Sequence, residues 1–99
     1  MNKIESRAAN RLVDRWRSGD TSSWSALKVL VEKQLIESVD RMFWNQTVEI
    51  RDRLKTMVPD IYGECLRKGE LDPASMKSFQ TYCATAMRHI SVQLYRYLH

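Results

Sequence analysis

Apolar side chains recur every three or four residues along four segments of this chain, and this spacing constrains its fold more than any other feature. It places the apolar side chains on one face of an α-helix, whereas a half-buried strand would require strict alternation. The segments cover residues 3–18, 21–44, 48–68 and 73–99. Because no alternating segment competes with them, the sequence predicts an all-α fold, a compact bundle of four to five helices.

Capping and stop signals separate the first helices. The Ser-Gly step at residues 18–19 stops the first helix, and Asp20 and Thr21 can cap the second by accepting hydrogen bonds from its free amides. We expect this second helix, which runs to about Trp44, to be the longest uninterrupted one. The polar residues 45–47 then mark a loop.

The two prolines lie in the second half of the chain. Pro59 falls inside the third apolar segment, where a missing backbone donor costs about 3 kcal/mol. We therefore expect a kink there, or a break at which Pro59 opens a further short helix. Gly69 ends this segment. Asp72 and Pro73 are a start signal for the last helix, because the aspartate can cap it and the proline sits where no donor is needed.

Length and composition predict one domain. The 99 residues, 43% of them apolar, suffice for one modest core, so residues 1–99 are expected to form a single helical domain. No stretch approaches the roughly 18 apolar residues that cross a bilayer, and no signal peptide is evident. We expect a soluble, cytoplasmic protein without membrane contact. Cys65 and Cys83 lack the spacing of a metal knuckle and are expected to be reduced, buried thiols.

Residues with catalytic or metal-binding chemistry are scarce. His89 and His99 are the only histidines, and His99 is the last residue. The carboxylates are spread over the predicted helix surfaces, and the sequence has no phosphate-binding loop, zinc-protease motif or nucleophile elbow. We therefore expect no enzymatic activity, no metal and no other cofactor.

Positive charge gathers near the end of the chain. The net charge is +4, and after Asp72 the chain carries Lys77, Arg88 and Arg96 but no acid. This distribution suits a polyanionic partner such as a nucleic acid. The stretch "AMRHISVQLYRYLH", residues 86–99, combines this charge with an apolar core stripe on one helix.

Three phrases of the sequence share their order and wording with one protein family. Residues 17–28 read "RSGDTSSWSALK", residues 56–69 read "TMVPDIYGECLRKG", and residues 79–97 read "FQTYCATAMRHISVQLYRY". In this order they resemble the second conserved region of bacterial RNA polymerase sigma factors of the extracytoplasmic-function group. The resemblance covers the chain from about Leu12 to Arg96. It implies a non-catalytic transcription initiation factor domain whose last helix packs along the second and third.

The resemblance also implies two binding surfaces. The exposed parts of residues 28–41 and the third helix would dock on the clamp helices of the largest subunit of core RNA polymerase. The loop after the third helix and the last helix would meet the non-template strand of the −10 promoter element, with Tyr82 receiving an unstacked base. The implied polymerase-binding residues are Met57, Asp60, Tyr62 and Glu64, and the implied DNA-binding residues are Lys68, Lys77, Tyr82, Arg88, His89, Gln93 and Arg96. An anti-sigma or other regulatory protein is a further implied partner.

The sequence departs from the family at both surfaces. Acidic positions around the second phrase are basic or neutral here, its glutamine is a proline, and an Asn and an Asp of the third phrase are replaced. These departures fall at Arg53, Lys55, Thr56, Pro59, His89 and Gln93. The family's fourth region, which reads the −35 element, has no counterpart in these residues. Two other interpretations therefore stay open: a stand-alone regulator with a sigma-like fold that acts by protein contact without DNA, and an unrelated helical bundle.

Overall fold

Four α-helices and one 3₁₀ turn make up the computed structural model, which describes residues 3–99. The elements are α1 (Lys3–Arg17), α2 (Ser23–Met42), α3 (Val48–Arg67), the 3₁₀ turn η1 (Pro73–Ser75) and α4 (Phe79–Leu98). The predicted all-α bundle of four to five helices is thus confirmed, with four α-helices in residues 3–99. None of the helices within residues 3–99 is both long and apolar enough to span a bilayer.

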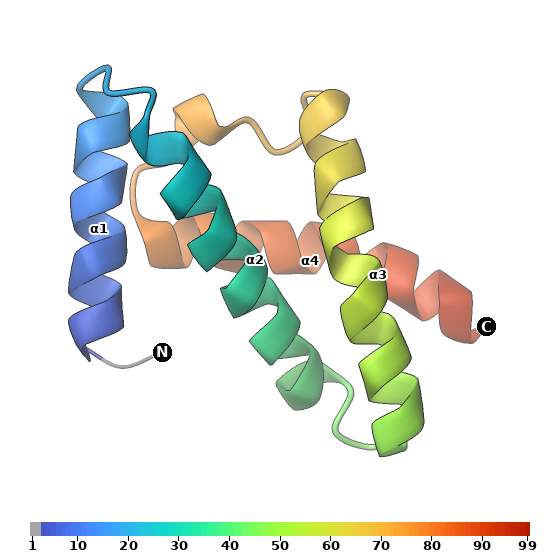
Figure 1. Cartoon of the computed structure of the whole chain (residues 1–99). Helices are drawn as coiled ribbons and strands as arrows, with labels where there is room; N and C mark the ends of the chain where they lie inside the picture. The colour runs from blue at the N-terminus through green and yellow to red at the C-terminus, as the bar shows by residue number, and fades with distance from the viewer. Residues whose placement is uncertain (1–2) are drawn as a thin grey trace.

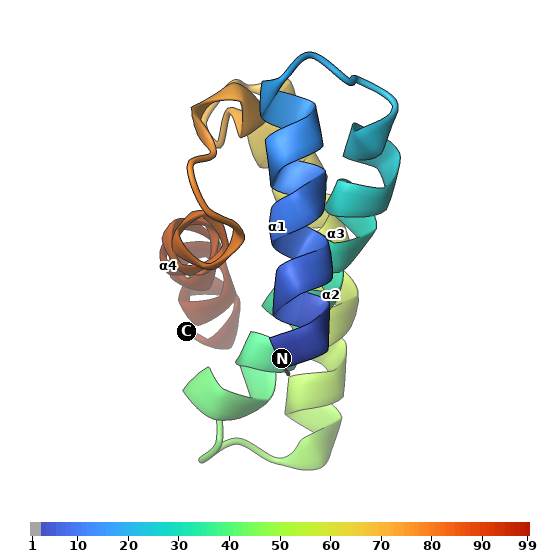
Figure 2. The ribbon, with the colours of Figure 1, turned by 90° about the vertical axis from the view of Figure 1, so that its left-hand side faces the viewer.

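The last helix crosses the others. α1 packs on α2 and α2 on α3, while α4 contacts all three and runs behind α2 and α3 (Figure 1). Figure 2 views α4 nearly end-on while α1 stands upright, so α4 does not run parallel to its neighbours. The bundle is therefore not a simple up-and-down arrangement of antiparallel helices.

The predicted stop and loop signals act as expected, but the predicted cap of the second helix and one length prediction are wrong. The N-cap of α2 is Ser22, which makes no capping bond with its side chain, and Asp20 accepts from the amide of Ser22 at 3.1 Å instead. Gly19 and Gly69 adopt positive φ angles of 102° and 74° just after α1 and α3, a backbone conformation that favours glycine. The hydroxyl of Thr47 caps α3 by accepting from the amide of Ile50 at 3.2 Å. The second helix is not the longest, because α2, α3 and α4 each contain 20 residues.

The predicted start of the last helix must be corrected. Asp72 caps only η1, by accepting from the amide of Ala74 at 2.9 Å. The chain then becomes extended, and α4 begins after Ser78, whose hydroxyl accepts from the amide of Thr81 at 3.2 Å. This interruption turns the side chain of Met76 into the core, where it is only 1% exposed.

Pro59 does not break the third helix. α3 continues through it from Val48 to Arg67, so no further short helix opens there. Proline removes one backbone donor, but Val58 and Tyr62, close to it on either side, are fully buried. Their packing holds the helix together on both sides of the proline, since helices in proteins owe most of their stability to tertiary contacts.

The core lies where α4 crosses α2 and α3. Its fully buried side chains include Leu27, Val31, Leu35 and Val39 of α2, Leu54, Val58 and Tyr62 of α3, and Phe79, Ala86, Ile90 and Leu94 of α4. Cys65 and Cys83 are buried and unbridged, as predicted. The apolar stripe of residues 86–99 is therefore first of all a core stripe.

A chain of two hydroxyl groups lies inside this core. The hydroxyl of Tyr82 donates to the backbone carbonyl of Leu71 at 2.8 Å, and the hydroxyls of Tyr62 and Tyr82 lie 2.6 Å apart. With the proton of Tyr82 engaged by Leu71, the hydroxyl of Tyr62 is left to donate to Tyr82. Burial raises the pKa of both phenols, that of Tyr82 to about 12.

Removing the two hydroxyls one at a time is predicted to have unequal effects. Tyr82→Phe leaves the carbonyl of Leu71 and the hydroxyl of Tyr62 without partners, and we expect it to lower the free energy of unfolding by about 1–3 kcal/mol. Tyr62→Phe leaves the bond to Leu71 intact and should cost about 0.5–1.5 kcal/mol. Urea unfolding followed by circular dichroism measures both, and a larger loss for Tyr62→Phe would contradict this order.

Candidate functional site

The solvent-facing side of α4 combines basic and aromatic side chains. Arg88, Val92, Tyr95, Arg96 and Tyr97 are all exposed and are called the α4 outer face. Arg88 and Tyr97, nine residues apart, lie at its opposite edges around the helix. α4 contains no carboxylate side chain. Its two arginines are eight residues apart, which corresponds to about 12 Å along the helix axis. That distance spans about three or four nucleotide steps of a stacked strand.

The two tyrosines of this face are held by neighbouring helices. The ring of Tyr95 packs against that of Phe43, with ring centres 4.9 Å apart, and Phe43 is itself only 1% exposed. The hydroxyl of Tyr97 accepts from the guanidinium of Arg53 on α3 at 3.1 Å. Trp44, which follows Phe43, is 76% exposed. Both tyrosine rings are therefore positioned while part of each stays accessible to solvent.

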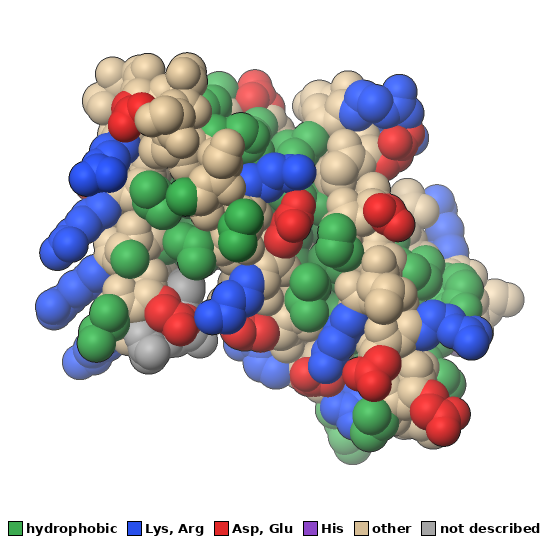
Figure 3. Space-filling model, in the orientation of Figure 1, with side chains coloured by type: hydrophobic (Ala, Val, Ile, Leu, Met, Phe, Trp, Pro, Cys, Tyr) green, Lys and Arg blue, Asp and Glu red, His purple; other side chains and the backbone are tan. Residues whose placement is uncertain are grey.

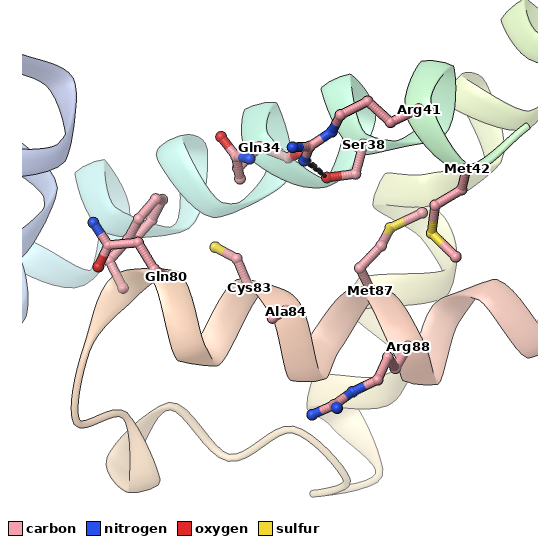
Figure 4. A pocket seen from close by; sticks show the side chains of 10 residues that line it. Gln34, Ser38, Arg41, Met42, Gln80, Cys83, Ala84, Met87 and Arg88 are labelled. Carbon is pink, nitrogen blue, oxygen red and sulfur yellow. Dashed lines mark hydrogen bonds between the residues drawn. The ribbon is translucent and has the colours of Figure 1, made fainter. Parts of the chain in front are cut away.

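A hollow of about 470 Å³ lies between α2 and α4. Figure 4 shows Met42, Cys83 and Met87 turned toward it, with Arg41 at its edge donating to the hydroxyl of Ser38 at 2.9 Å. Arg88 also lines this hollow, but its side chain points away from α2 in this view, so it borders both the hollow and the α4 outer face. Burial raises the pKa of the Cys83 thiol to about 12. With its thiol kept protonated, the hollow, lined by both apolar and polar side chains, offers no reactive thiolate.

A second hollow, of about 340 Å³, lies between α3 and α4. It is lined by Asp60, Ile61, Glu64, Cys65, Lys68, Glu70 and Gln93. Lys68 and Gln93 were predicted to meet DNA, and Asp60 and Glu64 to meet polymerase, yet the structure brings all four to one place. Three carboxylates lie here against Lys68 and the guanidinium of Arg67, which pairs with Glu64, and this excess of negative charge disfavours a phosphate backbone. Lys68 and Gln93 therefore do not extend the α4 outer face.

His89 also turns toward the α3 side. Its Nε2 lies 2.8 Å from Oε2 of Glu70, and this hydrogen bond lowers the pKa of the Glu70 carboxyl. The buried thiol of Cys65 is next to both, and burial followed by hydrogen bonding to Glu70 raises its pKa. His89 is thus engaged by a carboxylate and does not join the arginines. The sequence gives little signal of this cluster, since His89 lies 19 residues after Glu70 and only the helix crossing brings them together.

Two predicted contact residues are not at the surface. Tyr82 is 7% exposed and Tyr62 is 0% exposed, and each uses its hydroxyl inside the core. The prediction that Tyr82 receives an unstacked base is therefore wrong for this structure, and so is that of Tyr62 as a polymerase contact. Among the other predicted residues Met57 is partly buried against the core, whereas Lys77 is exposed.

A second basic surface lies on the first helix. Figure 3 shows basic side chains along the outer edge of α1, while acidic and basic side chains mix over α2 and α3. The exposed arginines of α1 include Arg7, Arg11 and Arg15. Asp14 interrupts this row, whereas the α4 outer face contains no acid. α1 and α4 therefore carry two distinct basic surfaces, and the effect of removing arginines can be compared between them.

Ionisation of Cys83 predicts a pH dependence of stability. At pH values below 9.0, the ordinary pKa of a thiol, Cys83 keeps its proton in both the folded and the unfolded state. Between pH 9.0 and about 12, only the unfolded state releases this proton. The free energy of unfolding should therefore fall as pH rises through this window, by at most about 1.4 kcal/mol per pH unit from this group. Cys83→Ala should show a shallower fall, because only Cys65 and the tyrosines then contribute. Urea midpoints measured below and within the window test this, and equal falls in both proteins would contradict it.

Comparison of the chain with family models, curated proteins and solved structures finds no match. The resemblance to sigma factors therefore rests on the three sequence phrases alone.

Proposed function

We propose that this chain is a non-catalytic, sigma region-two-like domain of transcription initiation. Its α4 outer face binds the exposed single strand of a −10 promoter element, and α2 and α3 dock on core RNA polymerase. The observation that carries the proposal is that α4 crosses α2 and α3 and turns outward a face with two arginines, two tyrosines and no carboxylate. The proposed DNA contacts are thus Arg88, Tyr95, Arg96 and Tyr97, together with Lys77.

The chemistry of the α4 outer face supports single-strand binding. Arginine side chains neutralise phosphates, while aromatic rings stack on unpaired bases at about 1–3 kcal/mol per base. Tyr95 and Tyr97 take the stacking role that the sequence assigned to Tyr82. Phe43 and Arg53 already hold these rings in place. Binding of a DNA strand therefore immobilises few additional side chains and loses little conformational entropy.

The crossing of α4 supports the sigma-like part of the proposal. A last helix packed along the second and third helices is what the resemblance implies, whereas an unrelated up-and-down bundle would place its helices antiparallel. The mixed charges over α2 and α3 provide a polar surface for docking on polymerase, with Asp60 and Glu64 exposed on it.

The salt dependence of DNA binding tests the role of the two arginines. We expect Arg88→Ala combined with Arg96→Ala to weaken binding of labelled, A/T-rich single-stranded DNA. The slope of log affinity against log salt should fall by about 1.4, since each lost phosphate contact removes about 0.7 for a single strand. Fluorescence anisotropy at several salt concentrations measures this slope.

Arg7→Ala combined with Arg11→Ala is the matched control. It removes the same charge from α1, whose arginines lie on the other basic surface. The slope should stay at the wild-type value in this variant. An equal reduction in both variants, or none in the α4 variant, would refute binding through the α4 outer face.

A second candidate function is protein contact without DNA, and the loop between α2 and α3 favours it. Trp44 in this loop and Val48 at the start of α3 expose 76% and 62% of their surfaces, and exposed apolar groups of this kind often mark contact sites. If this function holds, Trp44→Ala should abolish retention of core polymerase in a pull-down from a bacterial lysate. The variant that combines Arg88→Ala with Arg96→Ala should still retain the polymerase. Loss of DNA binding in the α4 variant would instead favour the first function.

A further inference from the structure

We infer that Cys65, Glu70 and His89 form a binding site for a thiophilic divalent cation, of which Zn²⁺ is the best-fitting example. One ligand atom from each residue lies within 4.8 Å of the others. This inference does not rest on nucleic-acid binding, because none of the three residues belongs to the α4 outer face.

The end of α3 brings two of the ligands together. The amide of Glu70 donates to the carbonyl of Cys65 at 3.0 Å, and the amide of Gly69 donates to that of Leu66 at 3.1 Å. This pair of bonds, with Gly69 in the left-handed region, is a Schellman motif. It folds the chain back at the helix end, so that the carboxylate of Glu70 can meet the thiol of Cys65 five residues earlier.

The third ligand comes from α4. Nε2 of His89 already lies 2.8 Å from Oε2 of Glu70. Since α4 crosses α3 at this level, the imidazole approaches from a separate element, and a bound cation would link α3 to α4. The three ligands are therefore placed by a helix cap and a helix crossing.

The ligand set and spacing fit zinc. Thiolate, imidazole and carboxylate bind Zn²⁺ at about 2.0–2.3 Å, so tetrahedral ligands lie roughly 3.3–3.8 Å apart. The present separations, from 2.8 Å to at most 4.8 Å, bracket this range, and small side-chain rotations would reach it. On binding, the thiol proton of Cys65 leaves to solvent as the metal–sulfur bond forms. Three protein ligands leave a fourth position for water or another small donor.

The surroundings favour a cation and give it a path. Asp60 and Glu64 line the same hollow as Cys65 and Glu70; Lys68 opposes them and Arg67 pairs with Glu64, which leaves the carboxylates in excess. The side chains of Glu70 and His89 are about two-fifths exposed, so a metal ion can enter from solvent without opening the core. The thiol of Cys65 forms the inner wall, where its residue is 4% exposed.

Cobalt titration of the whole 99-residue chain tests the site directly. Added Co²⁺ should produce a thiolate-to-cobalt charge-transfer band in the near ultraviolet with one ion per chain, and Zn²⁺ should abolish the band by displacing Co²⁺. Cys65→Ser should eliminate the band. Glu70→Gln and His89→Gln should each weaken binding by more than about tenfold, since even outer-shell changes cost roughly 10–100-fold.

Cys83→Ser is the matched control, because Cys83 is the other buried cysteine and lines the hollow between α2 and α4. It should bind cobalt as the wild-type chain does. Should Cys65→Ser fail to fold, the exposed Glu70 and His89 variants decide the outcome. Absence of the band in the wild-type chain, its persistence in Cys65→Ser, or undiminished affinity in both Glu70→Gln and His89→Gln would overturn the site.

Discussion

The hydroxyl chain from Tyr62 through Tyr82 to the carbonyl of Leu71 ties together the three segments that define this fold. α3, α4 and the loop between them each contribute one group, and all three groups are buried. A buried hydroxyl without a partner is costly, so α4 must place Tyr82 where both partners can be reached. This requirement fixes α4 across α3 at one level and thereby fixes which residues of α4 point outward.

The crossing divides the polar residues of α4 between two environments. Arg88 and Arg96 are exposed with Tyr95 on a helix that carries no acid, while Tyr97 reaches Arg53 of α3 at the far edge of the α4 outer face. His89 and Gln93 turn toward α3, where carboxylates surround them. A single helix thus supplies a surface suited to phosphates and a hollow suited to cations. The two adjoin along the helix, because Arg96 follows His89 by seven residues and so lies at nearly the same angle around α4.

Local signals predicted most of the fold, and nonlocal contacts decided the rest. Apolar spacing predicted the four helices, and Gly19 and Gly69 mark the ends of α1 and α3 because the effect of such a residue reaches only a few neighbours. The start of α4 at Phe79 was missed because burial of Met76 required an extended segment that no short motif encodes. The burial of Tyr82 was missed for a related reason. Its hydroxyl is satisfied by residues 11 and 20 positions away, and helical spacing alone cannot show such partners.

The segment between α3 and α4 is anchored at several points that do not depend on any ligand. The carbonyl of Pro73 accepts from the indole of Trp16 at 3.0 Å, that of Leu71 accepts from Tyr82, and Glu70 closes the cap of α3. A cation held by Cys65, Glu70 and His89 would add one more anchor to a segment already in place. Its main effect would then be to stabilise the junction of α3 and α4, because a ligand that binds only the folded chain raises stability by mass action. The α4 outer face would keep its shape with or without the cation, since Phe43 and Arg53 hold its tyrosines from other elements.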